Sequence, residues 1–465
     1  MASTEGTDEV YRAIDLSLRV GEILLSTGAG AADVAVTMRA VTTACGLRGC
    51  VIDVNFTTLA VSYQESPESP PETHLRQVQY RGLDYGYLSH VDELVRKLAA
   101  GHIDRAEASQ LLYEMQSTKR PYPKWLQTAS VGLMAGGISM LLGGRAIVIL
   151  ITFLTVVVID LMNRQLSKRR IPAFYQQVAG ALIATVSALV LHQLKAPVQP
   201  SLVIASGIVV LLAGISLVGA IQDALSGYYV TGAARSFEAI LLTGAVIAGV
   251  SVGLSIAKNF GVQLQVRTPS VDLFDLPVAL AGSVIATIAF AIVCQTPRRA
   301  LAACGLVGLL AQLIFQVSVE ARLGPTAASA LAALGVGLVA FSVANYVRVP
   351  PLVVVTTSIV ALLPGLTIYR GLFMLLTEEN LYGIVTLFTA ASIAVALASG
   401  AILGEYIAQP LAREAHRLET RLSGPRLVGP LRPVPRRTQR RAARQLRKQQ
   451  ERDAESSASE DGDSQ

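Results

Sequence analysis

Four polar residues in two neighbouring apolar segments could bind a small solute. Gln222 and Asp223 end one membrane-length apolar run, and Arg235 and Glu238 lie at the start of the next. A charged side chain at membrane depth is costly unless it is paired or faces water, so such residues usually mark a functional pathway. A zwitterion fits this set, because a carboxylate can bind its ammonium group and an arginine its carboxylate. An ion pair in a cytoplasmic loop fits the same residues equally well.

A second polar pair lies near the end of an earlier apolar segment. Asp160 and Asn163 are three residues apart, so they share one face of a helix. Asp160 could carry a proton or bind an amine. It could equally pair with Arg164 or Lys168 at the membrane surface, and the residues alone leave both readings open.

The composition is that of a membrane protein. Of the 465 residues, 52% are hydrophobic and only 15% are charged, and the mean hydropathy is +0.49, so charge is too sparse to solvate a soluble chain of this size. The charges gather in residues 1–124 and 411–465. The net charge of +6 therefore favours anionic lipid at one membrane face. It does not favour nucleic acid, because few aromatic residues accompany the basic ones.

Ten apolar segments approach the roughly 20 residues that a membrane-spanning helix needs. We therefore predict an α-helical polytopic membrane protein with five spans in residues 120–260 and five in residues 261–410. The segments are Trp125–Leu142, Ala146–Leu166, Pro172–Leu194, Ser201–Leu225, Phe237–Lys258, Leu276–Gln295, Ala300–Val317, Thr326–Val347, Leu352–Leu375 and Tyr382–Ile407.

The two groups of spans contain an internal repeat. When the chain is shifted by 151 residues without a gap, four glycines of the first group fall on glycines of the second: Gly214, Gly232, Gly249 and Gly253 on Gly365, Gly383, Gly400 and Gly404. Because each group has an odd number of spans, the two halves would lie in opposite orientations, as in secondary transporters with inverted repeats.

The same repeat places helix-breaking residues at matched positions. Pro364 and Gly365 interrupt the ninth segment, and Gly214 is the counterpart in the fourth. Interrupted helices at corresponding positions of two halves often mark a transport site, because the freed backbone groups can coordinate a substrate. A kink that serves only packing is the alternative.

Residues 1–119 read as a small α+β domain. Helical periodicity predicts helices over Val10–Ser26, Ala32–Ala44, Gly86–Ala100 and Asp104–Ser117, and alternation predicts strands within Cys50–Gln64 and Thr73–Arg81. We expect residues 1–9 to be disordered, and the polar start has no signal peptide, so the domain should be cytosolic.

The other end of the chain is a charged tail. Residues 411–465 should form a short helix and then disordered sequence, with the arginines of 436–447 near anionic lipid. Basic residues flank both the first span and the last, at Lys119, Arg120 and Lys124 and at Arg413, Arg417 and Arg421. This places both termini in the cytoplasm of a protein of the cell membrane.

The motifs of enzymes and metal sites are missing from the sequence. It contains no HExxH, no P-loop and no GxSxG, and its four cysteines form no CxxC pair. We therefore predict neither an enzyme nor a metal or other cofactor. An ATP-driven pump within this chain is excluded by the missing nucleotide motif.

Several short motifs resemble those of the threonine/serine exporters, which join a cytosolic N-terminal domain to about ten spans. The matching residues are Gly21–Ala29, Val34, Thr37, Met38, Gly46, Leu47, Gly101, Ile103, Asp104, Glu107, Ala108, Gly143, Gly144, Asp223, Gly227, Gly232, Arg235 and Glu238. The resemblance implies export of threonine and serine driven by the proton motive force. One departure is Ala35, where the family often has Glu, which puts a carboxylate role at that position in doubt.

Two other functions stay open on the sequence. The first is export of another small metabolite, such as a dicarboxylate or a dipeptide. The second is a membrane-anchored regulatory protein in which the N-terminal domain is the active part. The oligomeric state is also open, and a homo-oligomer is compatible with the sequence.

Overall fold

The N-terminal part of the chain forms four helices and a three-stranded sheet. The structure is a computed structural model that describes residues 2–79, 81–116, 121–193, 200–211, 214–259, 276–376 and 380–422. Its first elements are α1 (Ala2–Ser26), α2 (Ala31–Ala44), β1 (Val51–Val54), β2 (Thr58–Tyr63), β3 (Glu72–Gln77), α3 (Tyr85–Ala99) and α4 (Arg105–Gln116). The expectation of disorder at the start was wrong, because α1 begins at Ala2. An ion pair joins Arg12 to Asp8, one turn earlier in this helix.

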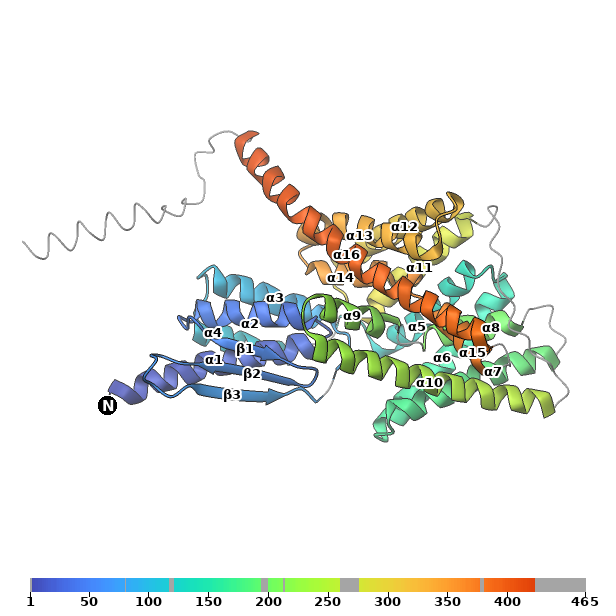
Figure 1. Cartoon of the computed structure of the whole chain (residues 1–465), viewed down its shortest axis with the longest axis horizontal. Coiled ribbons are helices and arrows are strands. Elements are labelled where there is room, and N and C mark those ends of the chain that lie inside the picture. Colours follow the sequence, from blue (N-terminus) through green and yellow to red (C-terminus); the bar gives the residue numbers. More distant parts are fainter. Residues whose placement is uncertain are drawn as a thin grey trace, which may run out of the picture. The chain divides into compact units, whose positions relative to one another are not determined.

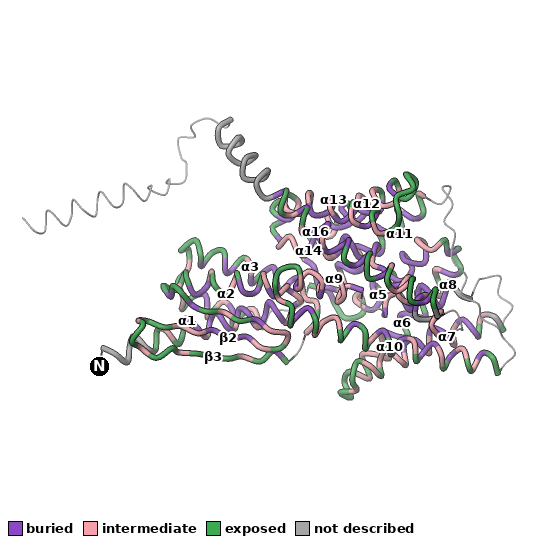
Figure 2. The backbone as a smooth tube through the Cα atoms, in the orientation of Figure 1, coloured by how far each residue is buried: buried purple, intermediate pink, exposed green. Residues whose placement is uncertain are grey.

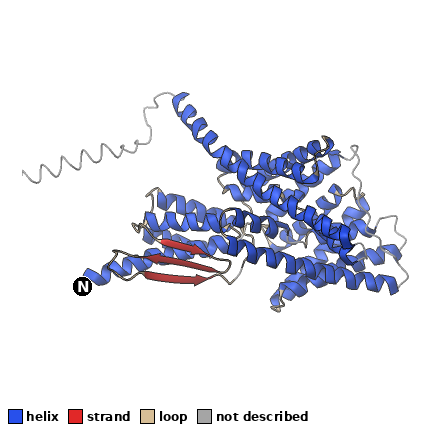
Figure 3. Cartoon of the chain, viewed as in Figure 1, coloured by secondary structure: helices blue, strands red, loops and turns tan. Residues whose placement is uncertain are grey.

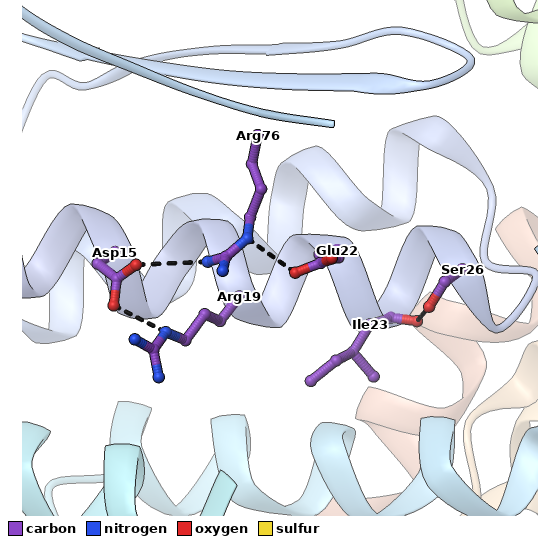
Figure 4. A network of polar contacts seen from close by, with 6 residues as sticks. All are labelled: Asp15, Arg19, Glu22, Ile23, Ser26 and Arg76. Carbon is purple, nitrogen blue, oxygen red and sulfur yellow. Dashed lines mark hydrogen bonds and ion pairs between the residues drawn. The ribbon is translucent and has the colours of Figure 1, made fainter. Parts of the chain in front are cut away.

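The sheet is antiparallel in the order β1-β2-β3, and it lies beside α1 (Figure 3). Leu59 and Val61 of β2 alternate toward the core and are fully buried. Arg76 of β3 ties the sheet to α1, with Nη1 3.3 Å from Asp15 and Nε 2.8 Å from Glu22 (Figure 4). These half-exposed ion pairs fix the register of α1 on the sheet more than they stabilise the fold.

The turn between α1 and α2 needs glycine. Gly28 has φ +102°, a left-handed conformation that a side chain would strain. Gly30 then precedes α2 in an extended conformation, and its N-cap position has no side chain to accept a hydrogen bond from the helix. The first turn of α2 is therefore open to an acceptor from elsewhere in the protein.

The rest of the described chain is helical, and Figure 1 shows its arrangement. The helices are α5 (Lys124–Leu141), α6 (Ala146–Lys168), α7 (Ala173–Gln193), α8 (Pro200–Val209), α9 (Gly214–Leu225), α10 (Tyr229–Asn259), α11 (Leu276–Val293), α12 (Arg298–Glu320), α13 (Pro325–Val347), α14 (Pro351–Ser358), the short 3₁₀ helix η2 (Val360–Leu362), α15 (Gly365–Leu376) and α16 (Asn380–Leu422). The chain divides after Pro410 into two units. The tail from residue 423 onward lies outside the described residues.

Fewer helices than the predicted ten are continuous membrane spans. Within the described residues, seven are long and apolar enough, and an eighth is obtained if α8 and α9, which meet at 44°, form one bent span. The first and ninth predicted segments fall short. Lys124 and Gln127 lower the hydropathy of α5, and the ninth segment is divided into α14, η2 and α15.

The membrane helices expose apolar side chains on their outer faces. In α6, Leu150, Leu154, Val158 and Leu161 recur at helical spacing, and each is more than half exposed. Phe237 and Ile240 of α10 are similarly exposed, and exposed and buried positions along the helices are coloured in Figure 2. Apolar surface of this extent is unusual on a soluble protein and is expected where a helix faces lipid.

The boundaries of the helices recur at a nearly constant spacing. From α5, α6 and α7 to α11, α12 and α13, the first residues are 152 apart, and from α8, α9 and α10 to α14, α15 and α16 they are 151 apart. Left-handed residues recur as well, since Gly143 and Arg170 follow α5 and α6 as Gln295 and Arg322 follow α11 and α12. The repeat seen in the sequence from Gly214 onward thus has a structural counterpart that extends back to α5.

The glycines of the repeat allow close contacts between helices. A Cβ on Gly232 would lie 2.7 Å from the carbonyl oxygen of Ala220, and one on Gly383 would lie 2.8 Å from that of Gly371. These two contacts join α9 to α10 and α15 to α16, which are corresponding pairs. Close backbone approach at small residues is how helices pack in a membrane, where the hydrophobic effect adds little.

Helices α5 and α11, the first of each group, cross at two glycines. A Cβ on Gly137 would lie 2.6 Å from the carbonyl oxygen of Gly282, and the reverse distance is also 2.6 Å. Near the start of α5, Tyr122 Oη donates to the carbonyl of Thr296 beyond the end of α11 at 2.9 Å. The two helices are therefore antiparallel.

We predict that Gly282→Val destabilises the protein, because the new side chain must displace the backbone of α5. Overpacking of this kind costs about 1–3 kcal/mol. The unfolding temperature of the purified protein in detergent should fall. Gly244→Ala on α10 is the control, since a Cβ there has nothing within 4 Å. Equal unfolding temperatures for the two variants would contradict the predicted close crossing.

Candidate functional site

Asp223 is the buried charged residue on which the site is built. It lies near the end of α9, its side chain is 2% exposed, and its Oδ2 is 2.5 Å from Nη1 of Arg235 on α10. Gly219 makes room for the arginine, because a Cβ there would lie 3.3 Å from the guanidinium. Arg235 is thus paired with a carboxylate of the protein itself, as the ion-pair alternative expects. In the zwitterion hypothesis its partner would be the carboxylate of the solute.

The second oxygen of Asp223 binds the N-terminal α+β part of the chain, α1 to α4 with the three-stranded sheet, which is called the N-terminal domain below. Oδ1 accepts a hydrogen bond of 2.8 Å from the backbone N–H of Ala31, the first residue of α2. Asp223 therefore caps a helix whose own N-cap residue is glycine, and its charge interacts favourably with the helix dipole. Each oxygen of this carboxylate therefore has one partner within the protein, and its charge is balanced by Arg235.

The N-terminal domain contacts both groups of membrane helices. On the first group, Thr231 of α10 donates to the carbonyl of Val54 at 3.4 Å. On the second, the N–H of Tyr85, at the start of α3, donates to the carbonyl of Cys294 at 2.7 Å. Gly86 permits this approach, because a Cβ there would lie 2.7 Å from the carbonyl oxygen of Gln295.

A cavity of 520 Å³ lies between the N-terminal domain and the membrane helices. The domain contributes the end of α1, the first turns of α2, and α3, and the membrane part contributes α9, α13, α16 and the start of α14. Its lining residues are Leu24, Ala29, Gly30, Ala32, Asp33, Val36, Thr37, Leu88, Asp92, Gln222, Asp223, Ser226, Phe341, Pro350, Pro351, Leu352, Ile402, Glu405 and Tyr406. A volume of this size suits a small organic ligand.

The charge of the cavity is one-sided. Its described lining contains four carboxylates and no lysine, arginine or histidine. Asp223 is paired with Arg235, and Asp92 is 2.6 Å from Arg96. Asp33 is exposed to the space of the cavity. Partial desolvation there, together with the neighbouring carboxylates of Asp223 and Asp92, raises the pKa of Asp33 above its ordinary value.

Arg81 approaches the same ion pair from the N-terminal domain. Its guanidinium lies 4.3 Å from the ring centroid of Phe56, and burial together with the charge of Arg235 lowers the pKa of Arg81 to about 10. The carboxylates of Glu238 and Asp223 act in the opposite direction. Glu238 itself is exposed on α10, so it contributes to the field around Arg81 without lining the cavity.

The predicted pair Asp160 and Asn163 lies elsewhere. Asp160 accepts a hydrogen bond from Thr128 at 2.7 Å and pairs with Arg164 at 2.8 Å, and Arg164 donates to the carbonyl of Lys124. These contacts fasten α6 to the first turn of α5. Asn163 is half-buried, and its Oδ1 has no hydrogen-bond partner among the described residues. Neither residue lines the cavity.

The predicted break residues from the two groups of helices meet. Helix α9 begins at Gly214 and α15 at Gly365, while Pro364 is the residue just before α15. A Cβ on Gly214 would lie 3.2 Å from Cβ of Leu363. The interruptions in the fourth and ninth segments are therefore in contact.

Two cavity residues that matter were not predicted as site residues. Asp33 follows the turn at Gly30, and Glu405 lies in the last span of the membrane part. Glu405 could have been found from the sequence, because an acidic residue within an apolar helix is rare and often functional. Asp33 gives no such signal, because an acidic residue in the first turn of a soluble helix is common.

The fold and site define a class, which is a multi-pass helical membrane protein with two groups of spans. Each group contains an interrupted helix, and the two interruptions are in contact. Interrupted helices at corresponding positions of two halves are typical of secondary transporters. Family models described as putative threonine/serine exporter and as threonine/serine exporter match residues 15–257 and 279–407. The chain belongs to the threonine/serine exporter family.

Individual relatives agree with this assignment. A probable threonine/serine exporter of Mycobacterium tuberculosis is 35% identical over 90% of this chain and 82% of its own length. A threonine/serine exporter of Corynebacterium glutamicum is 35% identical over 87% of this chain and 84% of its own. A probable succinate transporter subunit of Escherichia coli is 26% identical over 53% of this chain and 96% of its own. No solved structure matches.

We predict that Asp223→Asn destabilises the protein by about 3–5 kcal/mol, because it leaves Arg235 buried without a countercharge. Asparagine can still accept the hydrogen bond from Ala31. The double variant with Arg235→Gln should be less destabilised than the sum of the two single variants. Unfolding temperatures in detergent measure this, and strictly additive effects would contradict it. Arg164→Gln, which breaks a more exposed pair, should cost about 1 kcal/mol or less.

We predict that Asp33→Asn stabilises the protein near pH 7. A raised pKa means that the folded state holds the Asp33 proton more tightly than the unfolded state, so stability falls as pH rises through the folded-state pKa. The advantage of the variant should vanish toward about pH 4, the ordinary value for aspartate. Unfolding curves across this pH range are the measurement, with Glu68→Gln in an exposed turn as the control. A variant less stable than the native protein at pH 7 would contradict the prediction.

Proposed function

We propose that this protein exports threonine and serine across the cell membrane. The observation that carries the proposal is the similarity to two threonine/serine exporters, each 35% identical over nearly the whole chain. The cavity and the interrupted helices supply what such a function needs, which is a space for a small solute that both groups of spans border. Because the chain has no nucleotide motif, we propose that export against a concentration gradient is driven by the proton motive force.

Alternating access between two inverted halves is the proposed mechanism. The recurrence of helix boundaries at 151–152 residues and the antiparallel crossing of α5 and α11 support halves of opposite orientation. The contact of Gly214 with Leu363 brings both interruptions to the same place. A solute bound at this place would be open first to one side of the membrane and then to the other, as one half tilts against the other half.

We place the N-terminal domain and both termini in the cytoplasm, so that the cavity is the cytoplasmic entrance. Gln222 and Asp223 would stand at this entrance, and Arg235 and Glu238 would set the charge behind it. Asp160 and Asn163 would act through the packing of α5 and α6. Contact of the arginine-rich tail, residues 436–447, with anionic lipid remains a proposal about residues outside those described.

Efflux from vesicles tests the function. Purified protein in liposomes loaded with labelled threonine or serine should release both, and an inward proton gradient should accelerate the release. Empty liposomes and labelled succinate are the controls. Absence of gradient-dependent efflux would reject the proposal, and binding of a cytosolic protein without any flux would favour a regulatory role instead.

A further inference from the structure

Two of the four carboxylates of the cavity have no cationic partner. Asp92 and Asp223 are paired with arginines, whereas within the described part of the chain neither Asp33 nor Glu405 has an ion pair or a hydrogen bond to its carboxylate. Asp33 belongs to the N-terminal domain and Glu405 to α16, and both line the same cavity. Two parts of the protein therefore bring uncompensated negative charge to one space.

The remaining lining shows what kind of cation would fit. Phe341, Leu352 and Ile402 form an apolar part, while Thr37, Gln222 and Ser226 offer hydroxyl and amide groups. The described residues contain no group of three or more metal-ligating side chains that could hold a metal ion. The cavity is thus suited to a small organic molecule with a positively charged end, a polar middle and some apolar contact.

We propose that Asp33 and Glu405 bind the α-ammonium group of the amino acid as it enters the cavity. This inference rests on the proposed function and specifies how its substrate is recognised. Each carboxylate accepts a charge-assisted hydrogen bond from the ammonium group, and the bound cation relieves the repulsion between the carboxylates. Asp33 is the determinant that the N-terminal domain contributes, so the domain takes part in substrate recognition.

The same charge distribution selects against dicarboxylates. A dianion such as succinate would enter a cavity with four carboxylates and, among the described lining residues, no basic side chain. Repulsion between like charges in a partly enclosed space is costly. The charge of this cavity therefore disfavours succinate, the solute in the name of one relative that is 26% identical.

The test is efflux of labelled serine from liposomes that contain the full chain. The Michaelis constant for serine should rise about tenfold or more in Asp33→Asn and in Glu405→Gln, because a hydrogen bond to a charged group contributes about 1.5–3 kcal/mol. Internal ethanolamine, which keeps the ammonium group, should compete with serine in the native protein and lose this effect in both variants. Internal glycerate, which lacks the ammonium group, should not compete.

The controls separate recognition from folding. Asp33→Glu should keep the Michaelis constant within a few-fold of the native value, and Glu320→Gln at the exposed end of α12 should leave it unchanged. An unchanged constant in both Asp33→Asn and Glu405→Gln, or competition by glycerate in place of ethanolamine, would overturn the inference and leave serine export standing. A native protein that releases no serine would overturn the proposed function and this inference together.

Discussion

A single buried carboxylate joins the N-terminal domain to the membrane helices. Asp223 balances Arg235 with one oxygen and completes the first turn of α2 with the other. A buried ion pair is not by itself a strong source of stability, since desolvation offsets most of the attraction. The contribution of Asp223 is to position three elements, because its carboxylate has both of its partners only when α9, α10 and the start of α2 meet. The cavity lies at this junction, since Gly30, Asp33 and Gln222 all line it.

The same contact constrains how the protein can move. The domain is hydrogen-bonded to α9 and α10 in the first group of helices and to the end of α11 in the second. If the two groups of helices move relative to each other, the domain can stay attached to only one group, and its contacts with the other group must break. The hydrogen bond from Tyr85 joins backbone to backbone and involves no charge, whereas the Asp223 contact ends on a buried ion pair. The attachment at Cys294 is thus the cheaper one to release.

The sequence predicted the helices better than the site. Apolar length and glycine spacing identified the spans and the repeat, because both follow from local composition, and only the interrupted fourth and ninth segments and the polar start of α5 departed from the expected continuous spans. Asp223 and Arg235 stood out because charge among apolar residues is rare. Asp160 stood out for the same reason and pairs with its neighbour Arg164. Asp33 could not be found this way, since its importance comes from a cavity whose other wall is about 370 residues away in the chain, at Glu405.

Both groups of helices belong to one chain, and the N-terminal domain forms a cavity with residues of both groups. A relative described as a transporter subunit aligns over nearly its whole length with only about half of this chain, and separate family models match the two parts, residues 15–257 and 279–407. In this chain the cavity draws Asp33 and Gln222 from the first part and Phe341 and Glu405 from the second. A site divided in this way is complete only when both parts are present in equal number, and a single chain guarantees that without any affinity between free subunits. The close crossing of Gly137 and Gly282 then has only to orient the two parts, because the covalent link already keeps them together.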